Sequence, residues 1–256
     1  MEELTMYANY HTHTTRCRHA IGTEREYIQA AIDSGITILG FSDHTPFPGK
    51  RQSGMLPEEL SDYCDTLTAL IPEYPQLEMH IGLEVEYNPA NFAKLLDMLR
   101  QYPIEYMILG EHYFFGTPGE EAAQRPHSDR KLLALHCALC REAMETGLFT
   151  YFAHPDVVNF TGDEDYYLKQ MRKQCRWAAD RKIPMEINLH VVHVKTHYPS
   201  DRFWRIAGEE GCTVIIGTDA HDPLEFLNRD NLQVALDLVE RFHLNLIDST
   251  PIIPIK

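Results

Sequence analysis

The sequence lacks the long apolar runs and the basic surplus that mark membrane proteins and nucleic-acid-binding proteins. No stretch of its 256 residues approaches the roughly 18 apolar residues of a membrane helix. Lysine and arginine number 23 against 38 aspartate and glutamate residues, and the resulting net charge of −15 repels nucleic acid and anionic lipid at long range. We therefore expect no nucleic-acid partner and no membrane partner.

The sequence also lacks internal repeats and low-complexity segments. No targeting segment is expected, because residues 1–5 are acidic and have no apolar core. Its six cysteines are expected to be reduced thiols, which predicts a cytoplasmic protein. With 44% hydrophobic residues the chain can bury a sizeable core. We expect a single domain over residues 1–256, and the oligomeric state stays open, a homo-oligomer included.

Short apolar segments alternate with amphipathic segments along the chain. The apolar segments predict strands at 7–11, 37–42, 77–85, 106–110, 148–153, 184–188 and 212–217. The amphipathic segments predict helices at 23–34, 57–74, 90–101, 128–146, 163–181, 200–210 and 223–241. About seven βα units in succession favour an α/β fold with a parallel sheet closed into a barrel. A dinucleotide-binding fold is disfavoured, since no glycine-rich phosphate motif follows a strand.

Histidines and acids follow the carboxyl ends of these predicted strands, the edge at which α/β barrels carry their active sites. A His-x-His pair on a strand points both imidazoles to the same side, about 7 Å apart, so both can reach one ion. Grouped without a cation, these side chains would repel one another or leave polar atoms unpaired. The sequence therefore predicts a metal site built from His11, His13, His19, His44, Glu84, His112, His154, Asp219 and His221.

The remaining histidines lack this placement and are expected to be structural, with those in the loop after the sixth strand less clearly so. They are His80, His127, His136, His190, His193, His197 and His243. Cys137 and Cys140 form a Cys-x-x-Cys pair inside a predicted helix and have no partner pair. Two thiols on a helix face are therefore expected there, in preference to a zinc ribbon or a redox centre.

The motif series His11-Thr-His13, Ser42-Asp43-His44, Gly82-Leu-Glu84, Gly110-Glu-His112, Ala153-His154-Pro-Asp and Gly217-Thr-Asp219-Ala-His221 resembles that of the PHP (polymerase and histidinol phosphatase) superfamily. The segments 14–20, 41–46 and 197–199 are most similar to its histidinol-phosphatase branch. The resemblance implies a distorted (β/α)7 TIM-like barrel with three divalent metal ions. It also implies hydrolysis of L-histidinol phosphate to L-histidinol and phosphate, a step of histidine biosynthesis.

The same resemblance implies a distribution of the nine ligands over three ions. His11, His13, Glu84 and Asp219 would hold the first ion, and Glu84 would bridge to a second that His112 and His154 complete. The third ion would be held by His19, His44 and His221. Mixed imidazole and carboxylate ligands suit Zn, Mn or Fe and do not choose among them.

The expected chemistry is attack on phosphorus by a hydroxide that bridges two ions. Catalytic roles therefore fall on Glu84, as the bridging carboxylate, and on Asp219 and His221, which are also considered as proton donors. Asp43 and Asp156 are expected to orient imidazole N–H groups from behind the ligands. Glu86, Glu111 and Asp156 are candidates to attract a cationic substrate.

The phosphate contacts are harder to place, since residues 157–160, after the strand-5 histidine, contain no basic side chain where related phosphatases often have one. Arg18, Arg51 and Arg202 are the candidate replacements.

Three alternatives stay open. The first is a PHP phosphoesterase acting on nucleotides or other small esters. The second is an amidohydrolase, which shares the first His-x-His pair but usually has a lysine where the fourth strand here ends in His112. The third is a regulatory PHP domain that binds metal without catalysis.

Overall fold

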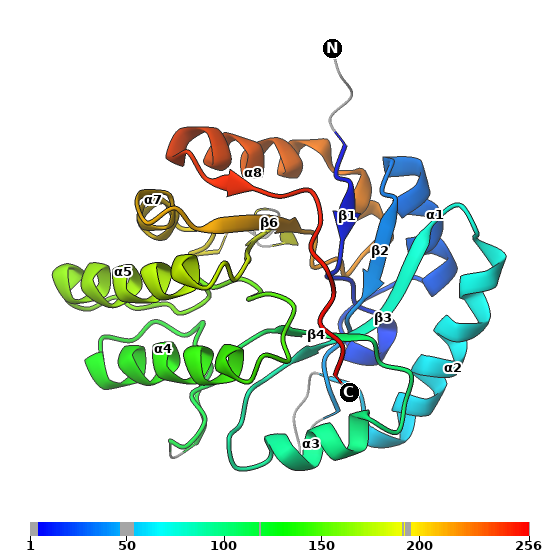
Figure 1. The fold of residues 1–256 in the computed structure, drawn as a ribbon, viewed down its shortest axis with the longest axis horizontal. Coiled ribbons are helices and arrows are strands. Elements are labelled where there is room, and N and C mark those ends of the chain that lie inside the picture. The colour runs from blue at the N-terminus through cyan, green and yellow to red at the C-terminus, as the bar shows by residue number, and fades with distance from the viewer. Residues whose placement is uncertain (1–4, 47–53, 118, 191, 193–195, 256) are drawn as a thin grey trace.

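The computed structural model describes residues 5–46, 54–117, 119–190, 192 and 196–255. Parallel strands form the centre and helices surround it (Figure 1). The strands are β1 (Ala8–Asn9), β2 (Ile38–Phe41), β3 (Glu78–Val85), β4 (Tyr106–Leu109), β5 (Met185–Asn188), β6 (Thr213–Gly217) and β7 (Asn245–Leu246). The helices are α1 (Glu24–Ser34), α2 (Leu60–Leu70), α3 (Phe92–Leu99), α4 (Arg130–Glu145), α5 (Glu164–Asp180), α7 (Asp201–Glu209) and α8 (Arg229–Phe242).

Within the described ranges, short 3-10 turns accompany these helices at η1 (Thr15–Cys17), η2 (Pro57–Glu59), η3 (Ile71–Glu73) and η4 (Pro223–Leu227). Two predicted helices are therefore divided: 57–74 into η2, α2 and η3, and 223–241 into η4 and α8. Helix α1 follows its sequence signals closely. Thr23 and Glu26 form a reciprocal capping box at its start, and Gly35 ends it at a φ of 87°, where a side chain would be strained.

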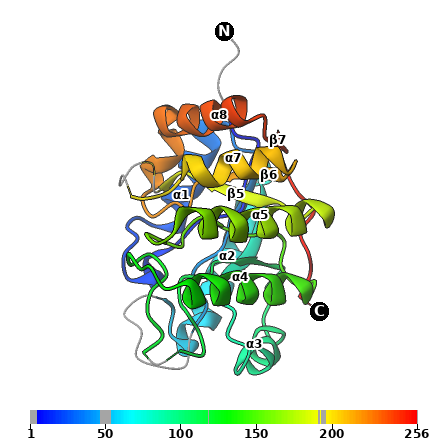
Figure 2. The same cartoon turned by 90° about the vertical axis from the view of Figure 1, so that its left-hand side faces the viewer.

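The strands pair in chain order, β1 to β4 in one sheet and β5 to β7 in another. Parallel bridges from Phe152 to Leu109 and to Met185 join the two sheets, and a parallel bridge from Thr12 to Ala220 returns from the β6 side to β1. The predicted α/β barrel is therefore confirmed. Figure 2 shows α8, α7, α5 and α4 stacked along one side of it.

The predicted fifth strand, 148–153, is the main error in the element predictions. Only Phe152 takes part in the ladder, as a single bridging residue between β4 and β5. Backbone hydrogen bonds nevertheless continue the barrel through this segment. Ala153 N donates to Leu109 O on the β4 side, and Phe152 N donates to Pro184 O on the β5 side. Apolar residues are buried here whether or not the ladder is regular, so hydrophobic patterning could not distinguish the two cases.

The C-terminal tail closes the end of the barrel where the strands begin. Tyr10 donates its hydroxyl hydrogen to Thr250 O at 3.1 Å, and Ile253 N donates to Thr150 Oγ1 at 3.0 Å. In Figure 1 this tail crosses the strands before it reaches the C-terminus. The opposite end, at the carboxyl ends of the strands, is left for the polar side chains. None of the helices in the described ranges is long and apolar enough to cross a bilayer.

Candidate metal centre

Glu84, near the end of β3, lies at the centre of the polar cluster with 2% of its side chain exposed. Its two carboxylate oxygens face different groups of imidazoles. Oε1 lies 2.8 Å from His154 Nε2 and 3.7 Å from His112 Nε2. Oε2 lies 3.5 Å from the Nε2 atoms of His11 and His13 and 2.9 Å from His44 Nδ1. One carboxylate therefore reaches both sides of the cluster.

Asp219, just beyond β6, makes close approaches that do not have hydrogen-bond geometry. Its Oδ1 lies 2.9 Å from His13 Nε2 and 3.4 Å from His11 Nε2. Yet Oδ1 and both of these nitrogens are buried without a hydrogen-bond partner among the described residues. Buried polar atoms are rarely left unpaired, and atoms that converge without bonding one another are arranged as ligands around a common point. The unpaired, converging atoms of His11, His13 and Asp219 therefore fit a bound cation.

His19 and His221 form a second convergence. Their Nε2 atoms lie 2.9 Å apart. The Nδ1 atom of His221 lies 2.8 Å from the Asp219 carbonyl oxygen, and that of His19 lies 2.8 Å from the Cys17 carbonyl oxygen. An Nδ1–H that donates to a carbonyl leaves a lone pair on Nε2. Two lone pairs facing each other repel unless a cation lies between them, so this pair also fits a metal site.

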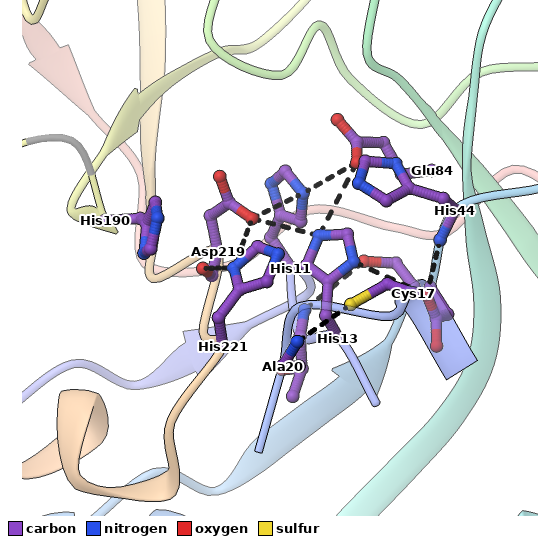
Figure 3. Close-up of polar contacts among 12 residues, drawn as sticks. His11, His13, Cys17, Ala20, His44, Glu84, His190, Asp219 and His221 are labelled. Carbon is purple, nitrogen blue, oxygen red and sulfur yellow. Dashed lines mark hydrogen bonds and ion pairs between the residues drawn. The ribbon is translucent and has the colours of Figure 1, made fainter. Parts of the chain in front are cut away.

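Ligand atoms within 4.8 Å of one another form several groups of metal-site size. These include His11 with Glu84 and His154, His11 with His13 and Asp219, His13 with His44 and His221, and Cys17 with His19 and His221. Figure 3 shows the rings of His11, His13, His44 and His221 gathered around Glu84 and Asp219. The structure thus brings all nine predicted ligands to one end of the barrel, from residues 11 to 221. Cys17 was not predicted there, and burial raises the pKa of its thiol to about 12.

The charges of the cluster are strongly coupled. Burial alone would raise the pKa of the Asp219 carboxyl, but the surrounding imidazoles, His11 foremost, hold it well below its usual range. The pKa of Glu84 is likewise lowered, against its burial, by His44 and His11. Both carboxylates are therefore ionised at neutral pH and available to cations.

Two acids behind the ligands determine which nitrogen of an imidazole faces the centre. Glu186, on β5, lies with Oε1 2.9 Å from His11 Nδ1 and also accepts from the hydroxyl of Tyr151 at 3.0 Å. Glu86 accepts from His112 N at 2.9 Å and lies 2.8 Å from its Nδ1. In both cases the Nδ1–H is engaged, and Nε2 is left to bind a metal.

Sequence reasoning missed this role of Glu186 and expected Glu86 to attract the substrate. Their spacing was the available sequence signal, because Glu186 and Asn188 are two residues apart at the end of β5 and so point to the same side of the strand, into the barrel. In the structure, Asn188 Nδ2 donates to Asp219 Oδ2 at 3.0 Å.

The other predicted acids differ in placement. Asp43 lies beside His13, but its Oδ1 is 3.6 Å from His13 Nδ1, which has no hydrogen-bond partner among the described residues. Asp43 Oδ1 instead accepts from the backbone N of His44 at 2.8 Å. Asp156 instead accepts from Ser200 N at 2.7 Å and has no hydrogen bond to an imidazole among the described residues. Burial raises the pKa of Asp156 to about 7. Glu111 turns away, accepting from Tyr87 N at 2.9 Å.

A cavity of about 240 Å³ opens over the cluster. Six of the predicted ligands line it, together with Thr45, Glu86, Tyr113, Ala122, Gln124, His190 and Tyr198. Sequence reasoning expected a structural role for His190, but this residue lies on the cavity wall and its Nδ1 is 3.0 Å from Glu225 Oε1. Gln124 and Tyr198 come from loops outside the strand-end pattern. Gln124 lies in no motif, whereas Tyr198 lies in the segment 197–199 that resembles the histidinol-phosphatase branch.

The predicted arginine contacts do not reach this cavity in the described part of the chain. Arg18 donates to Glu59 at 2.6 Å, and Arg202 donates to Glu164 at 2.8 Å and to Phe160 O at 2.7 Å. Both guanidinium groups are thus engaged elsewhere, and neither residue lines the cavity. Arg51 lies outside the described residues, as does His193. Among the described lining residues there is no lysine or arginine.

The remaining histidines and the Cys-x-x-Cys pair behave largely as expected. His136 is buried in α4, His80 pairs with Glu105 at 2.9 Å on the barrel flank, and His197 Nε2 lies 2.8 Å from Val157 O. Cys137 and Cys140 are free, buried thiols on α4.

Comparison with known families identifies this arrangement. The sequence profile of the PHP domain matches residues 9–190. The chain belongs to the PHP domain family. Asp219 and His221 lie beyond the matched stretch and join the PHP cluster through the pairing of Ala220 with Thr12.

Individual relatives agree with this assignment. A protein of Deinococcus radiodurans described as a probable histidinol-phosphatase is 29% identical over 231 residues, which is 87% of this PHP chain and 89% of that protein. A probable histidinol-phosphatase of Schizosaccharomyces pombe is 24% identical, with coverage of 83% and 80%.

A solved structure shares the fold. It is the histidinol phosphate phosphatase of Lactococcus lactis, described as a complex with zinc, L-histidinol and phosphate. The two chains superpose with a TM-score of 0.74 at 17% identity, covering 96% of this chain and 99% of the other.

Proposed function

We propose that this PHP protein is a metal-dependent phosphatase that hydrolyses L-histidinol phosphate to L-histidinol and phosphate, a step of histidine biosynthesis. The observation that carries the proposal is the convergence of nine imidazole and carboxylate side chains, with their free ligand atoms facing common points beneath a small cavity. The histidinol-phosphatase relatives, which match over most of their length, supply the substrate. The activity places the protein among phosphoric monoester hydrolases.

The ligand assignment is the one that the PHP resemblance implies, and the distances between the ligand atoms support it. His11, His13, Glu84 and Asp219 would hold one ion, and Glu84, His112 and His154 would hold a second. His19, His44 and His221 would hold a third. Divalent cations held there would offset the negative charge of the phosphate and lower the pKa of a water molecule. Imidazole and carboxylate donors without a thiolate suit Zn, Mn or Fe.

The protein's own residues determine how the ester is held. Glu84 and Asp219 carry the negative charge that retains cations at the cavity floor. Glu186 and Glu86 keep the Nε2 atoms of His11 and His112 turned toward that floor. The described cavity lining contains no lysine or arginine, so within this part of the chain the cations would bind the phosphate, and binding of the ester should depend on them.

Other phosphate monoesters are alternative substrates, and comparing their turnover tests the proposal. A nucleotide monophosphate is a second candidate, because the cavity floor recognises a phosphate and not its alcohol. The net charge of −15 disfavours long nucleic acid. The unpaired state of all six cysteines supports a reducing compartment such as the cytoplasm.

The experiment is a phosphate-release screen of L-histidinol phosphate against other small monoesters, including nucleotides, with metal analysis of the same sample. We expect the wild-type protein to prefer L-histidinol phosphate at least tenfold in kcat/KM. Glu84→Gln should lose both activity and bound metal, whereas Glu78→Gln, an exposed change on the same strand, should keep both. Equal turnover of all esters would contradict the proposed substrate. Full activity after exhaustive chelation would contradict the metal dependence.

A further inference from the structure

Tyr198 is a cavity-wall residue that none of the metal assignments uses. It is 5% exposed, and its ring centre lies 6.3 Å from that of His154. Its hydroxyl oxygen accepts a long hydrogen bond from Gln124 Nε2, at 3.5 Å, and both residues line the cavity above the cluster. Among the described residues the hydroxyl donates no hydrogen bond. A buried phenol at the cavity therefore has a hydrogen to offer.

The proposed reaction is helped by such a donor. When the bond between phosphorus and the ester oxygen breaks, that oxygen takes the electron pair, and an alkoxide is so basic that it leaves readily only when a proton or a cation takes up its charge. The predicted ligands cannot readily supply a proton. The Nδ1 atoms of His11, His112, His19 and His221 face acceptors on Glu186, Glu86, Cys17 and Asp219.

Few of the non-ligand residues on the cavity wall are suitable proton donors. The amide of Gln124 does not give up a proton, and the hydroxyl of Thr45 is a much weaker acid than a phenol. His190 directs Nδ1 to Glu225, so it has a proton to give from Nε2 only when the ring is doubly protonated, whereas a phenol carries its hydrogen throughout the neutral pH range. Of the two tyrosines on the wall, Tyr198 is the more buried and the ring of His154 lies against it, whereas Tyr113 is partly exposed.

We propose that the Tyr198 hydroxyl donates its proton to the ester oxygen of the substrate as the phosphorus–oxygen bond breaks, with Gln124 orienting that hydroxyl. The inference rests on the proposed monoesterase function. The oxygen of a water molecule forms the new bond to phosphorus and releases a proton to solvent. The ester oxygen receives the proton of Tyr198, and the phenolate recovers one from water, so one water is consumed for each alcohol and phosphate formed.

The test compares two versions of one substrate. The first is the alkyl phosphate monoester that the wild-type protein hydrolyses best, and the second is the same ester with sulfur in place of the bridging oxygen. A thiolate is a far better leaving group than an alkoxide and needs no proton. Tyr198→Phe keeps the ring and removes only the donor.

We expect Tyr198→Phe to lower kcat for the oxygen ester by about 100-fold, within the range of general acid catalysis, and for the sulfur ester by less than about 3-fold. Gln124→Met should show the same selectivity with a smaller loss. The matched control is Tyr113→Phe, which removes a second cavity phenol and should slow both esters to the same extent. Metal content and circular dichroism verify that each variant is loaded and folded.

Several outcomes would overturn the inference. Equal losses on the two esters would mean that Tyr198 holds the phosphate or supports the fold, and selectivity in Tyr113→Phe alone would assign the donor to the other phenol. A rise in KM at constant kcat would indicate binding only. If the wild-type protein prefers a different monoester, the proposed substrate is contradicted but the proposed role of Tyr198 is not. If it hydrolyses no monoester at all, both proposals are contradicted.

Discussion

At the scale of single residues, the site depends on which nitrogen of each imidazole carries hydrogen. The nine candidate ligands supply donor atoms, but their usefulness depends on neighbours that hold the other ring nitrogen. Glu186 does this for His11 while also accepting from Tyr151 and from Asn188. The residue was visible in the sequence, yet only its contacts show that it acts through a ligand.

Replacing Glu186 by glutamine should weaken metal binding by about 10- to 100-fold, because the amide can present an N–H to His11 Nδ1 and so favour the wrong tautomer. Competition of the protein with a chromogenic chelator measures the affinity directly. Glu78→Gln is the control, since its carboxylate is exposed on β3. Unchanged affinity in Glu186→Gln would show that other contacts orient His11.

His136 predicts a pH dependence of folding that is separate from catalysis. It is buried in α4, its Nε2 lies 3.6 Å from Cys140 Sγ, and burial lowers its pKa to about 3. The unfolded chain binds a proton near pH 6.5 and the folded chain does not, so stability falls as the pH drops from about 6.5 toward 3.

We expect His136→Leu to remove up to about 1.4 kcal/mol per pH unit from this acid-side slope. Urea unfolding of metal-free protein at pH 7.5 and pH 5.0, for the variant and the wild type, gives the two slopes. The absolute stability of the variant is not the readout, because the substitution also changes packing. Parallel slopes would contradict the prediction.

At the scale of elements, glycines at strand ends make room for the carboxylates of the neighbouring strand. A Cβ on Gly110, directly after β4, would lie 1.9 Å from Glu84 Oε1, and one on Gly217, at the end of β6, would lie 1.9 Å from Glu186 Oε1. Both distances are far below contact. The motifs Gly110-Glu-His112 and Gly217-Thr-Asp219 therefore contain glycine for a packing reason.

Gly110→Ala should displace the Glu84 carboxylate and lower both bound metal and phosphate release by at least about 10-fold, the scale of loss seen when a ligand is misoriented. Metal analysis of the purified, folded variant is the measurement. Circular dichroism separates this effect from general unfolding. A variant that retains its full metal content would show that β3 and β4 can move apart without cost to the site.

At the scale of the whole molecule, bound cations would join segments that are far apart in the chain. His11 follows β1 and Asp219 follows β6, and the barrel closes between them through the backbone bonds of His13 and Ala220. The same closure places like charges together, with Glu84, Glu186 and Asp219 all buried. A ligand that binds only the folded state stabilises it by mass action.

Removing metal with a strong chelator should therefore lower stability as well as abolish phosphate release. At a free ion concentration 1,000 times its Kd, one bound ion contributes about 4 kcal/mol. Thermal unfolding of chelated protein, before and after adding Zn²⁺ or Mn²⁺, measures the shift, and Glu84→Gln should respond less. An unfolding midpoint that is independent of metal would argue against a bridging role for the ions.

Much of this protein could be predicted from its sequence because the relevant signals are local. Strand and helix periodicity predicted the barrel, and the residues directly after strands predicted the cluster of candidate ligands, since parallel strands bring their carboxyl ends to one edge. The predictions failed where long-range contacts decide. Segment 148–153 retains a single bridging residue, Arg18 and Arg202 pair with acids instead of reaching the cavity, and Asp156 contacts Ser200.

The sequence by itself determined the order of the elements and the donor atoms at the mouth of the barrel, because both depend on neighbouring residues in the chain. Only the tertiary structure decided which imidazole nitrogen is free, which acids lie behind the ligands, and which loop residues form the cavity wall. Those features depend on the positions of side chains from loops such as those holding Gln124 and Tyr198, which meet across 74 residues of chain. No local sequence pattern predicts a contact between residues so far apart in the chain. The closure of the barrel brings the two loops together.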